Sequence, residues 1–279
     1  MRLHSLVATV LIVACQEGHT NQPTSTRSCV PKSGWILTWS DEFNGADGSS
    51  PDPTKWVAEN DGSGGGNSEL QYYTPRRENA RQETGSLVIE TLREKFAGHD
   101  GIQHNYTSAR LKTEGRFSQR YGRFEARIQV PSGQGVWPAF WLLGDDFSSA
   151  GWPTCGEIDI MENVGSEPAT IHGSLHGPGY SGANPLTAVY SLPRGRFSDA
   201  FHIFVVEWEP QAVRFYVDGE RYATKTPADI PAGTRWVYDH PFFVLLNLPV
   251  GGNMPGNPND STVFPQYMLV DYVRVYSRK

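Results

Sequence analysis

The sequence predicts an all-β protein, a sandwich of two antiparallel sheets, on three observations. Strand-like runs recur between turn signals along most of the chain. Regular helical periodicity is scarce over the same stretch. The chain also has 29 Gly and 20 Pro among its 279 residues, a composition that suits many short strands joined by turns. Together these observations favour a sandwich over a helical bundle.

The individual strands follow from local patterns. Strand-like runs lie at residues 35–39, 86–91, 122–130 and 204–208. Residues 212–217 alternate and are followed by Asp218-Gly219, a dipeptide suited to positive φ, so we expect a hairpin there. Residues 242–248 are nearly all apolar, as expected of a central strand, and residues 268–276 alternate clearly and close the domain.

The first residues are predicted to be an export signal. Arg2 provides a positive start, and the apolar run at residues 6–13 is too short to span a bilayer. Ile12-Val13-Ala14-Cys15 is similar to a bacterial lipobox, which predicts removal of residues 1–14 and lipidation of Cys15. Ordinary signal-peptide cleavage nearby is the alternative. We therefore expect a cell-envelope lipoprotein, in the outer membrane or periplasm, or a secreted protein.

The rest of the chain is predicted to be a short tether and one domain. Residues 15–33 are polar and read as a flexible tether, whereas residues 34–279 show no repeat and no second change of composition. If Cys15 is lipidated, Cys29 and Cys155 remain, and an export compartment permits a disulfide between them. The sequence does not show whether their Cα atoms come close enough to pair.

Charge and composition limit the partners. The net charge is −6 and no Lys/Arg cluster of the kind that tracks phosphates is visible, so nucleic acid is excluded as the expected partner. A neutral polysaccharide is favoured over a strongly anionic one. The eight His and three Cys lack the spacing of a zinc site. We expect a monomer.

Three carboxylates stand in a segment that otherwise resembles a buried strand. Glu157 and Asp159 are two apart and share a face, but a regular strand would turn Glu162 to the other face. One extra residue at Ile160-Met161, a β-bulge, would bring all three to one surface. A structural cation or a salt-bridge network is the alternative role, because buried charges need partners.

This set of acids suits glycoside hydrolysis. Two glutamates flanking a sugar bond can act as nucleophile and acid/base, and retention of configuration needs carboxyl groups about 5–5.5 Å apart. Acids this close cannot all ionise freely, so one of them should hold its proton to higher pH.

The segment Glu157-Ile158-Asp159-Ile160-Met161-Glu162 resembles the E-x-D-x-x-E signature of glycoside hydrolase family 16 in its laminarinase-like form. Further similar blocks follow in the family's order, at residues 39–43, 67–73, 121–127, 137–142, 175–177, 246–248, 250–253 and 271–275. The resemblance implies a β-jelly roll with an open concave cleft. It also implies a retaining endo-β-1,3-glucanase that needs no cofactor for catalysis. Glu157 would be the nucleophile, Glu162 the acid/base, and Asp159 a hydrogen-bond partner of the nucleophile.

Aromatic and imidazole side chains are the next candidates. Trp137 and Trp141 belong to a block that the family places near the cleft, and Trp152 precedes the acidic strand. Their rings could stack on sugars, although Trp141 could be a core residue and Trp152 could pack a loop. His176 would form a hydrogen bond near the leaving group. A structural role for His176 is the alternative, and His172 could share its face.

Other polar residues are expected at the cleft. Asn67, Glu69 and Gln71 alternate along the chain, and the resemblance makes Asn67 a sugar contact. Arg110 and Asn247 are further candidates for substrate binding, each with a structural role as the alternative.

The resemblance also implies a calcium ion away from catalysis, as in many family members. The matching positions are Glu42, Gly85 and Asp271, with backbone oxygens contributing. Two departures from the family pattern lie near the expected cleft. Met254 stands where many members have Trp, and Pro249 where many have Ala.

Three functions remain open at this point. The first is hydrolysis of β-1,3-glucan. The second is hydrolysis of another neutral glycan, such as mixed-linkage β-glucan or β-galactan. The third is carbohydrate binding without catalysis, which the presence of all three acids disfavours.

Overall fold

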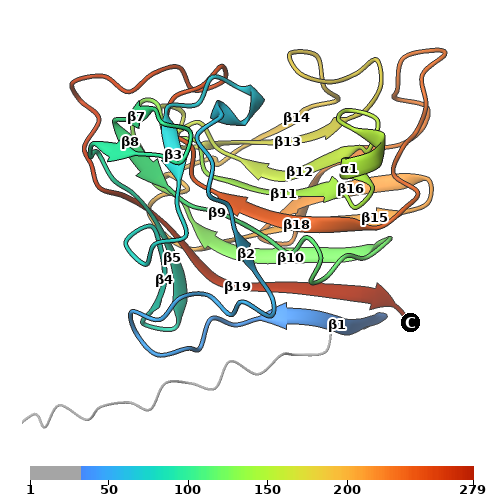
Figure 1. Cartoon of the computed structure of the whole chain (residues 1–279). Coiled ribbons are helices and arrows are strands. Elements are labelled where there is room, and N and C mark those ends of the chain that lie inside the picture. The colour runs from blue at the N-terminus through green and yellow to red at the C-terminus, as the bar shows by residue number, and fades with distance from the viewer. Residues whose placement is uncertain (1–32) are drawn as a thin grey trace, which may run out of the picture. The chain divides into compact units, whose positions relative to one another are not determined.

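Two antiparallel sheets dominate the computed structural model, which describes residues 33–279 (Figure 1). The predicted signal peptide, Cys15, Cys29 and all but the last residue of the predicted tether lie outside the described residues. The described residues contain no helix with the length and apolar character needed to cross a membrane.

The first sheet has eight strands. Its order is β17, β16, β15, β10, β19, β5 and β4, and β1 also pairs with β19. The bounds are β17 Glu220–Lys225, β16 Ala212–Val217, β15 His202–Glu209, β10 Gly122–Gln129, β19 Gln266–Arg278, β5 Ser86–Thr91, β4 Ala80–Glu83 and β1 Trp35–Asp41.

The second sheet has seven strands, and Figure 1 shows β14, β13, β12 and β11 following one another across it. Its order is β14, β13, β12, β11, β18, β9 and β2. The bounds are β14 Ala188–Ser191, β13 Thr170–His176, β12 Glu157–Glu162, β11 Ala139–Gly144, β18 Phe242–Asn247, β9 Arg110–Lys112 and β2 Val57–Ala58.

Small elements complete the domain. The strands β3 (Gln71–Tyr73) and β8 (Tyr106–Ser108) pair in parallel, and β6 (Phe96–Ala97) pairs with β7 (Gln103–His104). The helical turns are η1 (Gly64–Gly66) and α1 (Phe147–Ala150).

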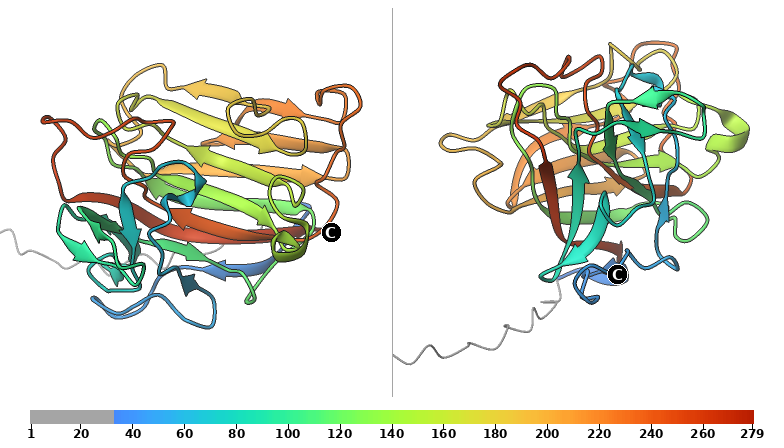
Figure 2. Two further views of the ribbon diagram at one scale, coloured as in Figure 1. Left: turned by 45° about the horizontal axis from the view of Figure 1, so that its top comes forward. Right: turned by 60° about the vertical axis from the view of Figure 1, so that its left-hand side comes forward.

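The hydrophobic core lies between the two sheets, which Figure 2 shows from two further sides. Phe124 on β10 and Trp208 on β15 belong to the same buried cluster as Phe140 on β11 and Ile158 on β12. The Trp208 indole N–H donates to the Tyr238 carbonyl oxygen at 3.1 Å, so this large side chain is buried without an unsatisfied donor. The predicted all-β sandwich is confirmed.

The long strands lie where the sequence predicted them. The hairpin at Asp218-Gly219 joins β16 to β17, and both turn residues have positive φ (51° and 88°). All six residues of β18 are buried. One face of β18 meets the core, and on the other face Phe243 and Leu245 pack with Leu143 and Cys155. The Cys155 thiol is free and buried.

Candidate active site

A β-bulge in β12 gathers the three acids on one face of the seven-stranded sheet. Across β11, Glu157, Asp159 and Glu162 pair with Leu143, Trp141 and Ala139, which alternate along their strand. The register shifts by one residue at Ile160. The predicted bulge is therefore confirmed. We call this surface the carboxylate face.

The neighbouring strand β13 shows the same arrangement. Glu157, Asp159 and Glu162 pair there with His176, Ser174 and His172, again alternate residues. The opposite face of the sheet carries apolar side chains into the core, including Ile158 and Leu175. The sheet therefore separates a polar reactive face from an apolar packing face, and burial of the apolar face is what fixes the register.

Asp159 lies at the centre of the acidic cluster. It is 3% exposed, and its Oδ2 is 3.0 Å from His176 Nε2, which in turn lies 3.8 Å from Glu157 Oε1. The ligand atoms of Glu157, Asp159 and His176 all lie within 4.8 Å of one another, a spacing that could also admit a cation. The other Glu157 oxygen, Oε2, accepts a hydrogen bond from the Trp152 indole N–H at 2.9 Å.

Burial raises the pKa of all three acids. Burial, and then the charge of Asp159, raise the pKa of Glu157 from 4.5 to about 8. Burial raises the pKa of Asp159 to about 7. Burial, followed by the charge of Asp159, holds the pKa of Glu162 well above 4.5. The cluster therefore does not carry three negative charges at neutral pH, as the close spacing of the acids predicts.

Each glutamate has its own tryptophan donor. Trp152 follows α1 and donates to Glu157, whereas Trp137 precedes β11 and its Nε1 donates to Glu162 Oε1 at 3.0 Å. Both hydrogen bonds favour the ionised carboxylate and oppose the effect of burial on the pKa. Trp152 is 44% exposed whereas Trp137 is 8% exposed, so Trp152 offers more ring surface to a ligand.

Trp141 is held by a chain of buried polar groups. Its Nε1 donates to Asn247 Oδ1 at 2.8 Å, and Asn247 Nδ2 donates to the Tyr73 hydroxyl oxygen at 3.1 Å. Tyr73 donates to Glu69 Oε2 at 2.9 Å. Arg110 Nη2 lies 3.4 Å from Glu69 Oε1 and balances this buried charge. The amide of Asn247 is thus engaged on both sides within the protein.

This series of hydrogen bonds was not predicted from the sequence. Tyr73 is buried in β3 and ends the block at residues 67–73, but no sequence pattern predicted that its hydroxyl links Asn247 to Glu69. Glu69 and Gln71, which the alternation placed beside Asn67 at the cleft, are buried instead, and Gln71 donates to Glu69 at 2.7 Å. Glu69 accepts the hydrogen bond of Tyr73, and Gln71 acts on Tyr73 only through Glu69.

Asn67 lies where two tight turns meet Trp137. Its carbonyl oxygen accepts a hydrogen bond from the Asn253 backbone N–H at 2.8 Å. Gly252, at φ +111°, packs so closely that an added Cβ would lie 3.4 Å from the Trp137 ring and 3.2 Å from the Asn67 carbonyl oxygen. Met254 follows in the same turn and is 38% exposed. An L side chain at position 252 would be strained at this φ and would crowd the Asn67 carbonyl oxygen.

Both histidines that the sequence left as alternatives lie on the carboxylate face. His176 pairs across the strands with Glu157, and His172 pairs with Glu162. The Tyr238 hydroxyl donates to the His176 carbonyl oxygen at 2.9 Å and fixes the backbone there. His172 Nε2 is 4.0 Å from Glu167 Oε2.

A model of one protein family matches most of the chain. The model for glycosyl hydrolases family 16 matches residues 68–272. The chain belongs to this family. The match includes the three acids and the candidate tryptophans Trp137, Trp141 and Trp152, whereas Glu42 and Asn67 precede it.

Individual family-16 proteins are similar over nearly the same stretch. A β-glucanase of Rhodothermus marinus is 43% identical over 87% of this chain and 85% of its own length. The glucan endo-1,3-β-glucosidase A1 of Niallia circulans is 36% identical over 88% of this chain, which spans only 38% of that longer protein. Among solved structures, the catalytic domain of an endo-1,3-β-glucanase (laminarinase) of Thermotoga petrophila has a TM-score of 0.82 and 47% identity. It covers 88% of this chain and 98% of its own.

The calcium positions implied by the family resemblance lie on the other sheet. Both Glu42 carboxylate oxygens are taken by Arg274, at 2.8 and 2.7 Å, and Asp271 Oδ2 accepts from Arg127 at 2.8 Å. Gly85 lies in the turn between β4 and β5, and Val270, next to Asp271, pairs with Leu87. Glu42 can therefore offer a cation its backbone oxygen but not its carboxylate.

Proposed function

We propose that this chain is a retaining endo-β-1,3-glucanase that cleaves β-glucan by double displacement. The observation that carries the proposal is the bulge at Ile160, which puts Glu157, Asp159 and Glu162 on one face, where burial raises the pKa of all three. The relatives named as a β-glucanase, a glucan endo-1,3-β-glucosidase and a laminarinase support the substrate. The reaction itself needs no cofactor, because both proton transfer and attack come from carboxyl groups.

In the first step, ionised Glu157 attacks the anomeric carbon and forms a glycosyl ester. The bond from that carbon to the leaving oxygen breaks, and its electron pair takes the proton of Glu162. Trp152 and His176 both favour the charged form of Glu157, which is the form that attacks. Glu162 has a pKa held well above 4.5, so it retains a proton to donate.

In the second step, water attacks the same carbon from the opposite side. Glu162, now a carboxylate, accepts the proton of that water, and Glu157 leaves as a carboxylate. Asp159 contributes through its charge, since it raises the pKa of both glutamates. Glu162 therefore regains from water the proton that it gave to the leaving group.

Substrate contacts are assigned around these acids. Trp152, with its exposed ring, and Trp137 and Trp141 would stack on sugar rings. His176 would contact the sugar unit next to Glu157. Asn67 would contact the glucan at the end of the cleft that Trp137 occupies. Arg110 and Asn247 would act mainly by holding Trp141 in position, because Arg110 Nη2 contacts Glu69 and Tyr73, and the Asn247 amide contacts Tyr73 and Trp141.

A calcium ion on the eight-stranded sheet is a separate part of the proposal. The backbone oxygens of Glu42 and Gly85 and the carboxylate of Asp271 would hold it, and it would join the first and last strands. Thermal unfolding in calcium and in EDTA tests this. Equal midpoints, together with no calcium in the purified protein, would contradict it.

Export and lipidation are supported by the sequence of residues 1–15 alone. The protein would be anchored in the bacterial envelope through Cys15, since the several acyl chains of a lipoprotein hold more firmly than one. Cys15→Ala should release the protein from membranes. Recovery of unmodified wild-type protein in the soluble fraction would contradict the anchor.

Release of reducing sugar from a glucan panel tests the substrate assignment. We expect kcat/KM to be highest on laminarin, lower on mixed-linkage β-glucan and lowest on carboxymethylcellulose and agarose. A preference for agarose or mixed-linkage glucan would contradict the β-1,3-glucan assignment but would leave the proposed mechanism unchanged. Binding of laminarin without any release of reducing ends would instead favour the non-catalytic alternative.

A further inference from the structure

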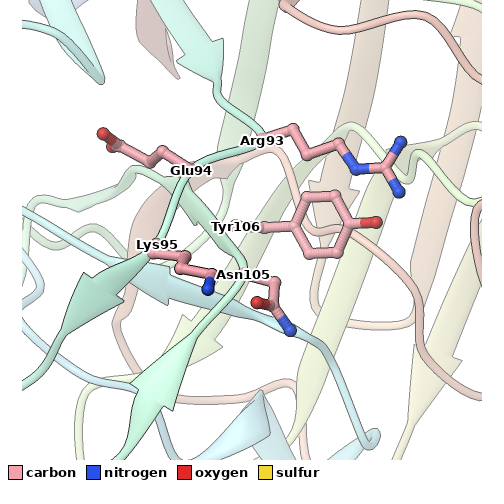
Figure 3. A pocket seen from close by; sticks show the side chains of 5 residues that line it. All are labelled: Arg93, Glu94, Lys95, Asn105 and Tyr106. Carbon is pink, nitrogen blue, oxygen red and sulfur yellow. The ribbon is translucent and has the colours of Figure 1, made fainter.

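Two hollows lie side by side outside the carboxylate face. The first, of about 460 Å³, is lined by Arg93, Glu94, Lys95, Asn105 and Tyr106, and Figure 3 shows it from close by. The second, of about 480 Å³, is lined by Leu92, Arg93, Thr262, Val263, Phe264 and Pro265. Arg93 lines both hollows, and the rings of Tyr106 and Phe264 lie 5.1 Å apart between their centroids. We call the two together the Arg93 groove.

The groove is built from segments that the proposed reaction does not use. Residues 92–95 follow β5, Asn105 lies between β7 and β8, Tyr106 begins β8, and residues 262–265 precede β19. Leu92 forms a bridge with Thr107, and the Thr262 hydroxyl donates to the Gln134 carbonyl oxygen at 2.8 Å. These contacts join residue 92 to β8 and anchor residue 262 to Gln134, so the groove is preformed rather than assembled by a ligand.

The two cations of the groove have no counter-charge. Within residues 33–279, Arg93 and Lys95 form no ion pair and no side-chain hydrogen bond, and both are exposed. Glu94, the acid between them, is engaged elsewhere with Arg76 and with the Thr107 hydroxyl, which donates at 2.5 Å. Figure 3 shows the Glu94 side chain pointing away from Arg93 and Tyr106. The groove is therefore locally positive in a chain of net charge −6.

The groove also has the features that recognise a sugar ring. Figure 3 shows Arg93 and Tyr106 extending in the same direction, so that a guanidinium and an aromatic ring border one hollow. Tyr106 and Phe264 are half-buried, which leaves part of each ring accessible. Aromatic rings stack on the apolar faces of sugars, and the Asn105 amide and the Tyr106 hydroxyl can meet sugar hydroxyls.

We propose that the Arg93 groove binds an acidic polysaccharide, with a sugar ring on Tyr106 and its carboxylate or sulfate between Arg93 and Lys95. Charge decides against a neutral chain. Covering two unpaired cations with a neutral sugar would remove their water without supplying a counter-ion, whereas an acidic sugar supplies one. Two adjoining hollows fit more than one sugar unit. The groove would hold the enzyme on an acidic matrix while the carboxylate face stays free for its substrate.

Affinity electrophoresis of the whole protein tests this site. The gels contain alginate for a carboxylate polymer, dextran sulfate for a sulfate polymer, or neutral dextran. We expect the two acidic polymers to retard the protein, neutral dextran to leave it unretarded, and added salt to weaken the effect. The acidic polymer that retards the protein more strongly shows whether the groove prefers a carboxylate or a sulfate.

Matched variants locate the binding. The double variant Arg93→Ala, Lys95→Ala should weaken acidic-polymer binding about tenfold or more, whereas Arg194→Ala, Arg196→Ala removes the same charge elsewhere and should change it within about twofold. Both pairs should keep wild-type kcat/KM on soluble laminarin. Galacturonate should compete better than acetate at equal concentration. Equal losses in the two pairs, retardation by neutral dextran, or equal competition by acetate would each overturn the proposal.

Discussion

Asp159 Oδ2 lies 3.0 Å from His176 Nε2, although the two residues come from adjacent strands and are not directly paired. Asp159 pairs across β13 with Ser174, and His176 pairs with Glu157. The imidazole therefore reaches diagonally between the central acid and the expected nucleophile. This contact joins the cluster into one electrostatic unit, so a change at Asp159 should be felt at both glutamates.

Asp159→Asn should move the whole pH profile of kcat/KM to lower pH. The charge of Asp159 raises the pKa of Glu157 and of Glu162, so its removal lowers both. Glu157 would then ionise at lower pH, and Glu162 would lose its proton at lower pH. Each limb should move by about one pH unit, equivalent to ~1.4 kcal/mol of charge interaction. Unmoved limbs with a reduced rate would show that Asp159 acts only by position.

Trp152→Phe should move only the acidic limb of the same profile. The ring stays but the N–H that favours ionised Glu157 is lost, so the pKa of Glu157 rises and the limb moves to higher pH. Trp137→Phe is the matched variant, because it removes the donor to Glu162 and should move the alkaline limb to higher pH. Identical profiles for the two variants would contradict the separate roles of the glutamates.

Tyr73→Phe should destabilise the fold and should weaken the hydrogen bonds that position Trp141. The hydroxyl donates to Glu69 and accepts from Asn247, so its loss leaves the buried Asn247 amide N–H unsatisfied and removes one of the donors to Glu69. We expect the free energy of unfolding to fall by about 1–3 kcal/mol in urea titrations. KM should rise more than kcat falls, because Trp141 binds rather than reacts. Tyr72→Phe on the same strand is a comparison that leaves this chain intact.

The acidic cluster should make the protein less stable as pH rises. The folded pKa of Glu157 is about 8, above its ordinary 4.5, so the folded state binds more protons than the unfolded state between these values. The contribution of Glu157 to the free energy of unfolding is fully present below the unfolded pKa of 4.5 and is lost as pH rises through the folded pKa of about 8. Glu157→Gln should therefore raise the thermal midpoint near pH 8 more than near pH 5. An equal gain at both pH values would contradict a raised pKa at Glu157.

The sequence was sufficient for the long strands and for the acids. Residues 86–91 match β5 at both ends, and the parity of Glu157, Asp159 and Glu162 required the bulge that the register shows at Ile160. These features are local, because alternation and parity are properties of neighbouring residues. Strands such as β2, β6 and β7 have two residues each and carry no period of their own.

The polar chain behind Trp141 could not be predicted in the same way. Asn247 and Tyr73 are 174 residues apart and meet only because β18 passes β3 in the folded domain. Alternation placed Glu69 and Gln71 with Asn67, yet the turn at η1 puts Ser68 at φ 59° and breaks the alternation there. Burial of these two residues is a tertiary effect that no local pattern encodes.

The most direct test of the central claim is the stereochemistry of azide rescue. Glu157→Ala and Glu162→Ala are each given an aryl β-laminaribioside with azide, and the glycosyl azide is identified by NMR. Without its nucleophile, Glu157→Ala should let azide attack directly and yield the α-azide. Glu162→Ala still forms the glycosyl enzyme and should yield the β-azide. The α-azide from Glu162→Ala, or wild-type turnover by Glu157→Ala without azide, would contradict the assignment of the two glutamates.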